Sequence, residues 1–317
     1  MIGDMTRNST ITQPLLSKQG HVVMALARQL LSCEPGDTIM RVQEYAAELE
    51  ASTGTIHAAL SYLQDSQAVT LEGRGRLGTV VHQLDYPLLW KLAFGRSVVG
   101  ALPLPYTKRF EGLATGIREQ FDRCPVSLDV RFLRGSSHRL QGLASNHFDW
   151  VLISRFAAET ASVHGFAIET VMLLGPGTYT VDHVLLGKPG VGGLRDGLRV
   201  GIDTRSTDHS WIVRTLCRGL KVEFVEINYS QVLKLLESGV IDVTVGPREH
   251  LPANHEHFSI IPLSSQAGMD LTPFTEAALV VDRGNRAAVH ILKSVLEAEQ
   301  LLHSQREIVN LARLPAY

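Results

Sequence analysis

The feature that most constrains the fold is an alternation of apolar, β-branched runs with helical patterns from Ser97 to Tyr317. The runs that predict strands are Val98–Leu102, Leu128–Phe132, Trp150–Ser154, Ile168–Leu173, Leu198–Asp203, Val222–Ile227, Val243–Gly246 and Ala277–Val281. The segments that predict helices are Phe110–Phe121, Ser137–Ser145, His209–Cys217 and Ser230–Ser238. Strands that alternate with helices are typical of an α/β domain, and we expect mainly parallel sheets.

This part of the chain also repeats its own pattern. In each half, a strand, a helix, a strand and a helix precede a short turn and an Asp, which is Asp149 in the first half and Asp242 in the second. Two similar lobes from one chain predict a clamshell that binds its ligand at the carboxyl ends of the strands. We expect both Asp residues to fix turns, and the glycine-rich segment Gly187–Gly193 to connect the lobes as a hinge.

The N-terminal part has a different pattern. Helical periodicity runs over Gln19–Cys33, over Val42–Leu49, and from the N-cap Ser52 to about Ser66. Strands are expected at Ala68–Glu72 and Thr79–Leu84, around the hairpin Gly73-Arg74-Gly75-Arg76-Leu77-Gly78. Three helices and a Gly-Arg hairpin match the layout of a winged helix-turn-helix, which places its third helix in the major groove of DNA.

The predicted division of the chain has four parts. Residues 1–17 form a mobile tail, residues 18–84 a winged helix, residues 85–96 a linker, and residues 97–317 a bilobed effector-binding domain. The linker carries Trp90 and Phe94, and we expect its apolar side to need a partner surface.

Hydroxyl groups and local positive charge suggest how the winged helix contacts DNA. Hydroxyls and amides near a helix start suit phosphate oxygens, and a His can reach a base edge. The candidate DNA-binding residues are Ser52, Thr53, Thr55, His57, Ser61, Arg74, Gly75 and Arg76. Against this interpretation, residues 18–84 carry five Lys or Arg and seven Asp or Glu, whereas DNA binders normally present a basic surface. The alternative is a small dimerisation domain with a solvated hairpin.

Strand-to-helix loops of the second domain carry the candidate effector contacts. Hydroxyls, amides and Arg side chains at helix starts favour an anionic ligand such as a carboxylate, phosphate or phosphonate. The candidate residues are Pro105, Tyr106, Thr107, Arg134, Ser136, Ser154, Arg155, Thr204, Arg205, Ser206, Thr207 and Asp208. The alternative is that the hydroxyls are ordinary helix caps and the arginines are solvated.

Composition and motifs narrow the remaining function classes. The three cysteines form no CxxC pair, the start of the chain has no apolar signal core, and no apolar run spans a membrane, so we expect a cytoplasmic protein without disulfides. The cluster His255-Glu256-His257 has no third ligand nearby, and residues 187–193 lack the order of a phosphate-binding loop. Because GxSxG and HExxH are also absent, we expect no metal, no cofactor and no catalysis.

Several segments resemble known regulators. Ser52-Thr53-Gly54-Thr55-Ile56-His57 and Gly73-Arg74-Gly75-Arg76 resemble the winged helix of GntR-type proteins. Ala101-Leu102-Pro103-Leu104-Pro105-Tyr106-Thr107, Glu111-Gly112, Ser154-Arg155 and Gly201-Ile202-Asp203 are similar to the YhfZ family. That family joins a helix-turn-helix to a domain like type 2 periplasmic-binding proteins. The resemblance implies DNA binding, an effector cleft between two lobes and a homodimer. GntR-type proteins commonly have Arg where this chain has Thr53 and His57, so their DNA contacts do not transfer.

These inferences favour a dimeric transcription regulator that binds double-stranded DNA and senses a small anionic metabolite. Two alternatives remain from the sequence. The bilobed domain could be an enzyme, because such folds also host catalysis. The chain could also be a cytosolic binding module whose N-terminal domain serves dimerisation.

Overall fold

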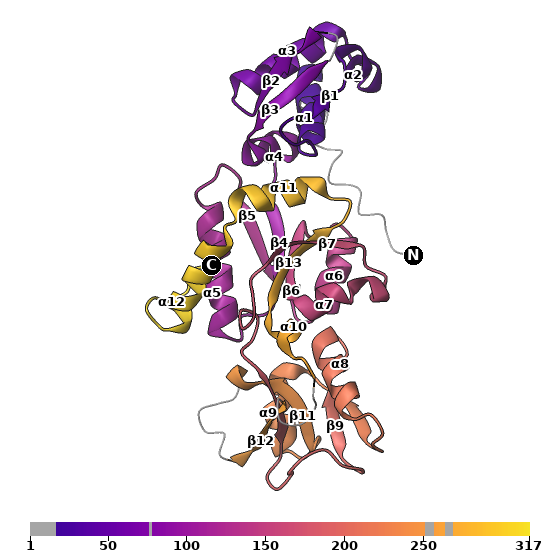
Figure 1. The fold of residues 1–317 in the computed structure, drawn as a ribbon, viewed down its shortest axis with the longest axis vertical. Coiled ribbons are helices and arrows are strands. Elements are labelled where there is room, and N and C mark those ends of the chain that lie inside the picture. Colours follow the sequence, from indigo (N-terminus) through magenta and orange to yellow (C-terminus); the bar gives the residue numbers. More distant parts are fainter. Residues whose placement is uncertain (1–16, 76–77, 251–256, 264–268) are drawn as a thin grey trace. The chain divides into compact units, whose positions relative to one another are not determined.

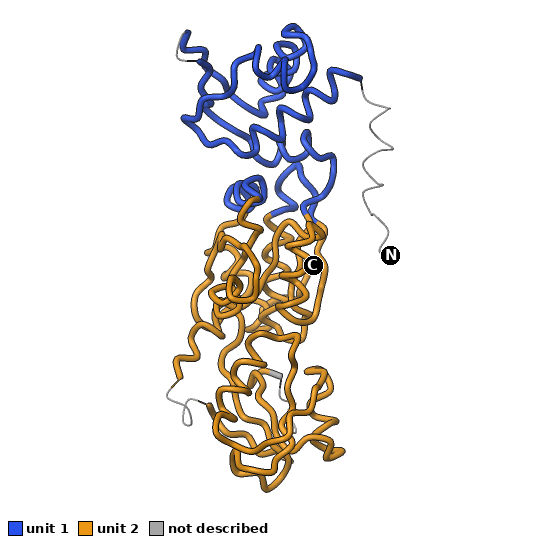
Figure 2. Tube along the Cα trace, turned by 90° about the vertical axis from the view of Figure 1, so that its right-hand side faces the viewer, with its two compact units in different colours: residues 1–98, 121–128, 285–295 blue, residues 99–120, 129–284, 296–317 orange. Residues whose placement is uncertain are grey.

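The computed structural model describes residues 17–75, 78–250, 257–263 and 269–317. The chain divides into two compact units, each built from separate segments (Figure 2). The winged-helix unit takes in the chain up to Val98, residues 121–128 and residues 285–295. The two-lobed unit consists of residues 99–120, 129–284 and 296–317.

The winged-helix unit contains the three predicted helices and the predicted hairpin (Figure 1). Its elements are α1 (Lys18–Leu30), β1 (Thr38–Ile39), α2 (Val42–Glu48), α3 (Thr53–Asp65), β2 (Val69–Gly73) and β3 (Thr79–Leu84). The strands form an antiparallel sheet in the order β1-β3-β2. The sequence did not predict β1, because two residues are too short to show an alternating pattern. Residues 1–16 of the predicted tail lie outside the described residues.

The predicted linker folds as a helix, α4 (Tyr86–Phe94), which starts where Asp85 accepts a hydrogen bond from Leu88 N at 2.8 Å. Its residues Leu89 and Trp90 are completely buried. Helices α1 and α11 (Arg286–Val295) pack against α4 and cover this apolar side. The expectation that the linker needs a partner surface is therefore wrong, because the same chain supplies the cover.

Helix α11 also holds the end of α1 by hydrogen bonds. His290 Nδ1 donates to the Leu31 carbonyl at 2.8 Å, and Arg286 Nη2 donates to Glu34 Oε1 at 2.7 Å. The last carbonyls of a helix have no partner within the helix, so such contacts fix where the chain turns away. The winged-helix unit is thus completed by a segment more than 250 residues further along the chain.

The two-lobed unit contains two five-stranded sheets, one in each lobe (Figure 1). The first sheet has the order β5-β4-β6-β13-β7, with β4 (Val98–Leu102), β5 (Leu128–Phe132), β6 (Trp150–Ser154), β7 (Ile168–Leu173) and β13 (Ala277–Asp282). The second has the order β10-β9-β11-β8-β12, with β8 (His183–Gly187), β9 (Arg199–Ile202), β10 (Glu223–Glu226), β11 (Val243–Pro247) and β12 (Ser259–Pro262).

The predicted repeat is present in the strand order. The first half contains α5 (Lys108–Phe121) and α6 (Ser136–Ala144), and the second contains α8 (Thr207–Leu216) and α9 (Val232–Glu237). The strands around them have the equivalent orders β5-β4-β6 and β10-β9-β11. In both lobes the first and third of these strands along the chain, β4 with β6 and β9 with β11, pair in parallel.

Asp149 and Asp242 have the same role in the two lobes. Asp149 Oδ2 accepts a hydrogen bond from Val99 N at 2.8 Å, and Asp242 Oδ2 accepts one from Arg199 N at 2.8 Å. Each carboxylate therefore joins the turn before the third strand to the beginning of the first strand. The Arg199 guanidinium lies against Asp242 and holds the pKa of that carboxyl well below its usual range.

The sheets are mixed rather than mainly parallel. Strand β13 is antiparallel to β6 and β7, and β8 is antiparallel to β11 and β12. The chain enters the second lobe between β7 and β8 and returns between β12 and β13. The segment Gly187–Gly193 begins at the end of β8 and leads toward β9 in the same sheet, so its predicted role as the connection between lobes is wrong.

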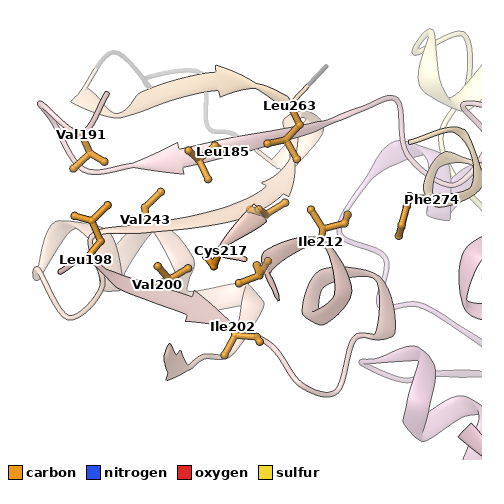
Figure 3. Packing of buried hydrophobic residues seen from close by; sticks show 12 residues of the cluster. Leu185, Val191, Leu198, Val200, Ile202, Ile212, Cys217, Val243, Leu263 and Phe274 are labelled. Atoms are coloured by element: carbon orange, nitrogen blue, oxygen red, sulfur yellow. The ribbon is translucent and has the colours of Figure 1, made fainter. Parts of the chain in front are cut away.

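Each lobe has its own apolar core. In the first lobe, α6 and α7 (Arg155–Glu159) cover one face of the sheet, and α5 and α12 (Ala298–Val309) lie on the other side (Figure 1). In the second lobe, Leu185, Val200 and Val243 from three neighbouring strands meet α8 (Figure 3). Phe274 of α10 (Thr272–Thr275) belongs to the same cluster. None of the helices in the described part of the chain is long and apolar enough to cross a membrane.

Candidate functional site

The outer face of α3 presents most of the predicted DNA-binding side chains. Thr53, His57 and Ser61 are exposed along this helix, and Tyr62 beside them is 49% exposed. Ser52 is the N-cap and accepts a hydrogen bond from Thr55 N at 3.1 Å. The Ser52 and Thr55 hydroxyls also bond to each other at 2.9 Å, so these two groups stabilise the start of the helix.

The hairpin between β2 and β3 carries Arg74 and Gly75, while Arg76 lies outside the described residues. Arg74 N donates to the Gly78 carbonyl at 2.8 Å, and Gly75 and Gly78 both have positive φ angles. The Arg74 guanidinium is 3.4 Å from Glu72 Oε2, and Glu72 also contacts His82. His82 and Arg74 together lower the pKa of Glu72. The charge of Arg74 is therefore shared with an acid in the same hairpin.

A cavity of about 780 Å³, open mouth included, lies where the two lobes meet. Its walls come from the loops after β4 and β5, from the segment between β7 and β8 by which the chain enters the second lobe, and from the ends of β9 and β11. The lining residues are Pro103, Leu104, Tyr106, Thr107, Phe110, Arg134, Gly135, Ser136, Arg139, Tyr179, Thr180, His183, Asp203, Ser206, Asp208, His209, Tyr229, Gly246, Pro247 and Glu249. This is the position that the repeat predicts, because strands of both lobes end there.

Six predicted effector residues line this cavity: Tyr106, Thr107, Arg134, Ser136, Ser206 and Asp208. Pro105 lines an adjoining cavity together with Tyr106 and Glu249. The remaining five do not line the main cavity: Ser154, Arg155, Thr204, Arg205 and Thr207.

Four of those five side chains have partners within the protein. Ser154 is completely buried and donates to Asp208 Oδ1 at 2.6 Å. Arg155 pairs with Glu159 at 2.6 Å and with Glu276 at 3.2 Å. The Thr204 hydroxyl donates to Glu226 at 2.9 Å, and Thr207 Oγ1 accepts from Ser136 Oγ at 3.1 Å. Arg205 is exposed.

The start of α8 contacts the start of α6 directly. Thr207 N donates to Ser136 Oγ at 3.1 Å, and Ser137 N donates to the Arg205 carbonyl at 3.4 Å. Gly135 has φ +82°, and a Cβ atom added there would lie 2.5 Å from the Arg205 carbonyl oxygen. Protein groups thus occupy amides that the sequence assigned to an anionic ligand, and the two lobes touch through backbone.

Two arginines of the cavity have different surroundings. Arg134 forms hydrogen bonds to Asp203 across the lobes, with Nε to Oδ2 at 3.1 Å and Nη2 to Oδ1 at 2.9 Å. Arg139 is 2% exposed and donates to the carbonyls of Leu133 and Leu152. Arg139 Nη2 donates to the Tyr179 hydroxyl at 3.2 Å. Burial raises the pKa of Tyr179 to about 12, so that hydroxyl stays protonated.

Burial shifts the pKa values of two neighbouring residues of α8. Burial raises the pKa of Asp208 to about 6, against the hydrogen bond from Ser154 and the charge of Arg139. Burial lowers the pKa of His209 to about 4. The Asp203 N–H donates to His209 Nδ1 at 3.1 Å, so the neutral ring carries its proton on Nε2, which donates to the Val245 carbonyl at 3.0 Å.

Glu249 is the third acid of the cavity. Its Oε1 pairs with Arg109 and accepts from Val181 N at 3.1 Å. Its Oε2 is buried and has no hydrogen-bond partner among the described residues. Burial raises the pKa of Glu249, and the Arg109 charge opposes that shift.

Sequence reasoning missed Arg139, His209 and Glu249 as lining residues. Arg139 lies on a helix between apolar positions, and Glu249 follows a strand near residues that form no recognised motif. No local pattern distinguishes these side chains from ordinary surface residues. Only the meeting of the two lobes brings them to one cavity.

No cluster of three or more His, Cys, Asp or Glu side chains suited to a metal ion occurs in the described residues. His255 and Glu256 of the tightest sequence cluster lie outside that part of the chain.

Comparison with known proteins identifies the family to which this architecture belongs. Residues 85–317 match the profile of the YhfZ C-terminal domain, and residues 34–81 match that of a helix-turn-helix domain. The chain belongs to the YhfZ family. The resemblance inferred from Pro103–Thr107 is therefore confirmed, and so is the combination of a helix-turn-helix with a YhfZ C-terminal domain in one chain.

The chain is similar to one YhfZ protein over nearly its whole length and to solved structures over about two thirds to three quarters of it. The protein YhfZ of Escherichia coli is 30% identical over 312 residues, which is 95% of this chain and 98% of the relative. The crystal structure of YhfZ from Shigella flexneri is 27% identical, covers 74% of this chain and 98% of that chain, and has a TM-score of 0.61. A periplasmic substrate-binding protein of an ABC transporter from Coxiella burnetii is 11% identical, covers 69% of this chain and 100% of that chain, and has a TM-score of 0.44.

The contact between the lobes of this YhfZ-family protein generates a stability prediction. Gly135→Ala is expected to lower the free energy of unfolding by roughly 1–3 kcal/mol more than Gly165→Ala. Both glycines have nearly the same φ, +82° and +81°, but a Cβ at Gly165 meets no atom within 4 Å. The difference between the variants therefore reports the clash with Arg205, and urea unfolding measures it. Equal losses in both variants would contradict the contact.

The buried carboxylate of Asp208 generates a pH prediction. Its pKa rises from 3.8 to about 6 on folding, so its contribution to stability is complete below about pH 4 and is lost as the pH rises through 6. The loss corresponds to roughly 3 kcal/mol. Asp208→Asn keeps an acceptor for Ser154 and is expected to be the more stable protein at pH 7.5. Urea unfolding from pH 4.5 to 7.5 tests this, and a constant difference between the two proteins would contradict it.

Proposed function

We propose that this YhfZ-family protein is a DNA-binding transcription regulator that responds to a small polar effector carrying an anionic group. The observation that carries the proposal is the combination, in one chain, of a helix-turn-helix with a charged cavity where two lobes meet. A buried, partly apolar cavity with a few convergent polar groups is typical of small-molecule sites.

On the DNA side, the exposed face of α3 enters the major groove. Thr53, His57 and Ser61 are exposed and do not cap the helix, and they supply contacts to phosphates or base edges. Ser52 and Thr55 position the helix start, whose amides suit a phosphate oxygen. The hairpin with Arg74, Gly75 and Arg76 contacts the DNA backbone.

On the effector side, Arg134 is the anion contact that the geometry favours over Arg205. Arg134 lines the cavity, and its Nη1 forms no hydrogen bond with the described residues. Thr107, Ser136 and Ser206 surround the same space with hydroxyl groups. A charge-assisted hydrogen bond from a guanidinium to an anion is among the stronger polar contacts in proteins.

Effector binding acts on DNA affinity through the chain segments that join the two units. Helix α4 leads into β4, and α11 follows β13 along the chain, so these two helices of the winged-helix unit adjoin strands of the first lobe in sequence. An effector that binds one arrangement of the lobes more tightly than another shifts the population of that arrangement. We propose no catalytic step, and turnover of a bound metabolite would support the enzyme alternative instead.

The DNA interface is tested by the hairpin arginines. The double variant Arg74→Ala, Arg76→Ala is expected to bind every duplex more weakly and to reduce the slope of log affinity against log salt by about two, because two phosphate contacts are lost. Fluorescence anisotropy at several salt concentrations measures the slope. Arg131→Ala in the other unit removes an exposed arginine and serves as the matched control. An unchanged slope in the double variant would mean that the hairpin does not touch DNA.

The oligomeric state is a separate prediction. A single winged helix reads only a short half-site, so we expect a homodimer that binds two half-sites related by two-fold symmetry. Light scattering at micromolar protein concentration is expected to give twice the monomer mass of 34.8 kDa. A monomer at that concentration would contradict the prediction.

A further inference from the structure

The positive and negative side chains around the cavity balance one another. Two arginines line it, Arg134 and Arg139, together with the acids Asp203, Asp208 and Glu249. Arg134 pairs with Asp203, Arg109 behind the wall pairs with Glu249, and the charge of Arg139 acts on Asp208. The described walls therefore carry no excess of positive charge that would balance a ligand bearing only negative charge.

This balance disfavours a simple anion. Taking an ion out of water into a largely buried site costs several kcal/mol unless an opposite charge compensates it. An anionic group at Arg134 would have to share that guanidinium with Asp203. A ligand that brings its own positive charge compensates the acid, so its net desolvation cost is lower.

Two acids in the cavity also have unused hydrogen-bonding capacity. Asp208 is only 7% exposed, and of its two oxygens only Oδ1 accepts a hydrogen bond from the described residues. Glu249 Oε2 is buried without a partner among those residues. A buried carboxylate oxygen without a donor is costly, and a ligand N–H group would satisfy it. The tyrosines Tyr106 and Tyr229 line the same cavity, and aromatic faces attract cationic nitrogen.

We infer that the effector is a compact zwitterion that places its anionic group at Arg134 and a protonated amine at the acids Asp208 and Glu249. The inference rests on the proposed function, because it assumes that this cavity is the effector site. One cavity lined by all three residues allows a single small molecule to reach both kinds of charge.

The protonation of Asp208 is consistent with this ligand. Burial raises its pKa to about 6 in the protein alone. An ammonium group next to the carboxylate favours the ionised form, so binding lowers that pKa and releases a proton at slightly acidic pH.

The test uses matched probes that differ only in their charged groups. The first series is phenylalanine, phenyllactate and phenethylamine, and the second is alanine, lactate and ethylamine. The third is 2-aminoethylphosphonate, ethylphosphonate and ethylamine. The melting temperature of the full-length protein is measured with each probe at equal concentration, because a ligand that binds the native state stabilises it. In at least one series, the zwitterion is expected to raise the melting temperature more than its anionic and cationic counterparts do.

Variants then assign the contact to the cavity acids. Asp208→Asn and Glu249→Gln are each expected to weaken binding of the stabilising zwitterion by roughly tenfold or more, the range for a charge-assisted hydrogen bond. Glu276→Gln is the matched control, because Glu276 is a buried acid of the same unit that does not line the cavity. Calorimetry measures each affinity, and a separate melt without probe shows that each variant is folded.

Two results would overturn the inference. In one, no series favours the zwitterion, because in each series that shifts the melting temperature the anion or the cation stabilises the protein at least as much. In the other, no probe shifts the melting temperature. The proposed function fails on a different measurement, which is the absence of sequence-specific DNA binding by the same preparation. Sequence-specific DNA binding together with a preference for a plain anion would therefore support the proposed function and contradict only the inference that the effector is a zwitterion.

Discussion

The contact between the N-terminal ends of α6 and α8 is the constraint on which the two-lobed unit depends. Gly135 lies so close to the Arg205 carbonyl that no side chain fits between them. Ser136 then reaches Thr207, and Arg134 reaches Asp203. Because backbone meets backbone here, the contact has almost no tolerance for change. It also fixes which helix-terminal amides remain for a ligand, and the amide of Thr207 is not among them.

Pairing of buried charge follows from that contact. Where the lobes meet, three arginine side chains and three acidic side chains are largely removed from water. Buried ions are costly in proteins unless an opposite charge pairs with them. All three interactions between opposite charges cross from one lobe to the other: Arg134 pairs with Asp203, Arg109 pairs with Glu249, and the charge of Arg139 acts on Asp208. The charged residues that line the cavity are therefore already close to charges of opposite sign. Selectivity in such a site depends on the arrangement of charge within the ligand more than on its net charge.

The winged-helix unit shows the same dependence on distant segments. Its helix α4 packs against both α1 and α11, and His290 and Arg286 of α11 bond to the chain at Leu31 and Glu34. The segments before and after α11 belong to the two-lobed unit. A helix-turn-helix completed in this way is covalently linked to the two-lobed unit at five points of the chain, after residues 98, 120, 128, 284 and 295.

Local sequence determined much of this protein. Strands such as β4 and β6, the cap at Ser52, the repeat that ends in Asp149 and Asp242, and the loop with Tyr106 and Thr107 follow from short-range patterns, because burial and capping set residue types within a few positions. The antiparallel strands β8 and β12, the cover that α11 provides, and the roles of Arg139, Asp208 and Glu249 depend on contacts across long sequence separations. No window of sequence contains both partners of such contacts. Only the tertiary structure decided which hydroxyls and arginines face the cavity and which ones the protein itself uses.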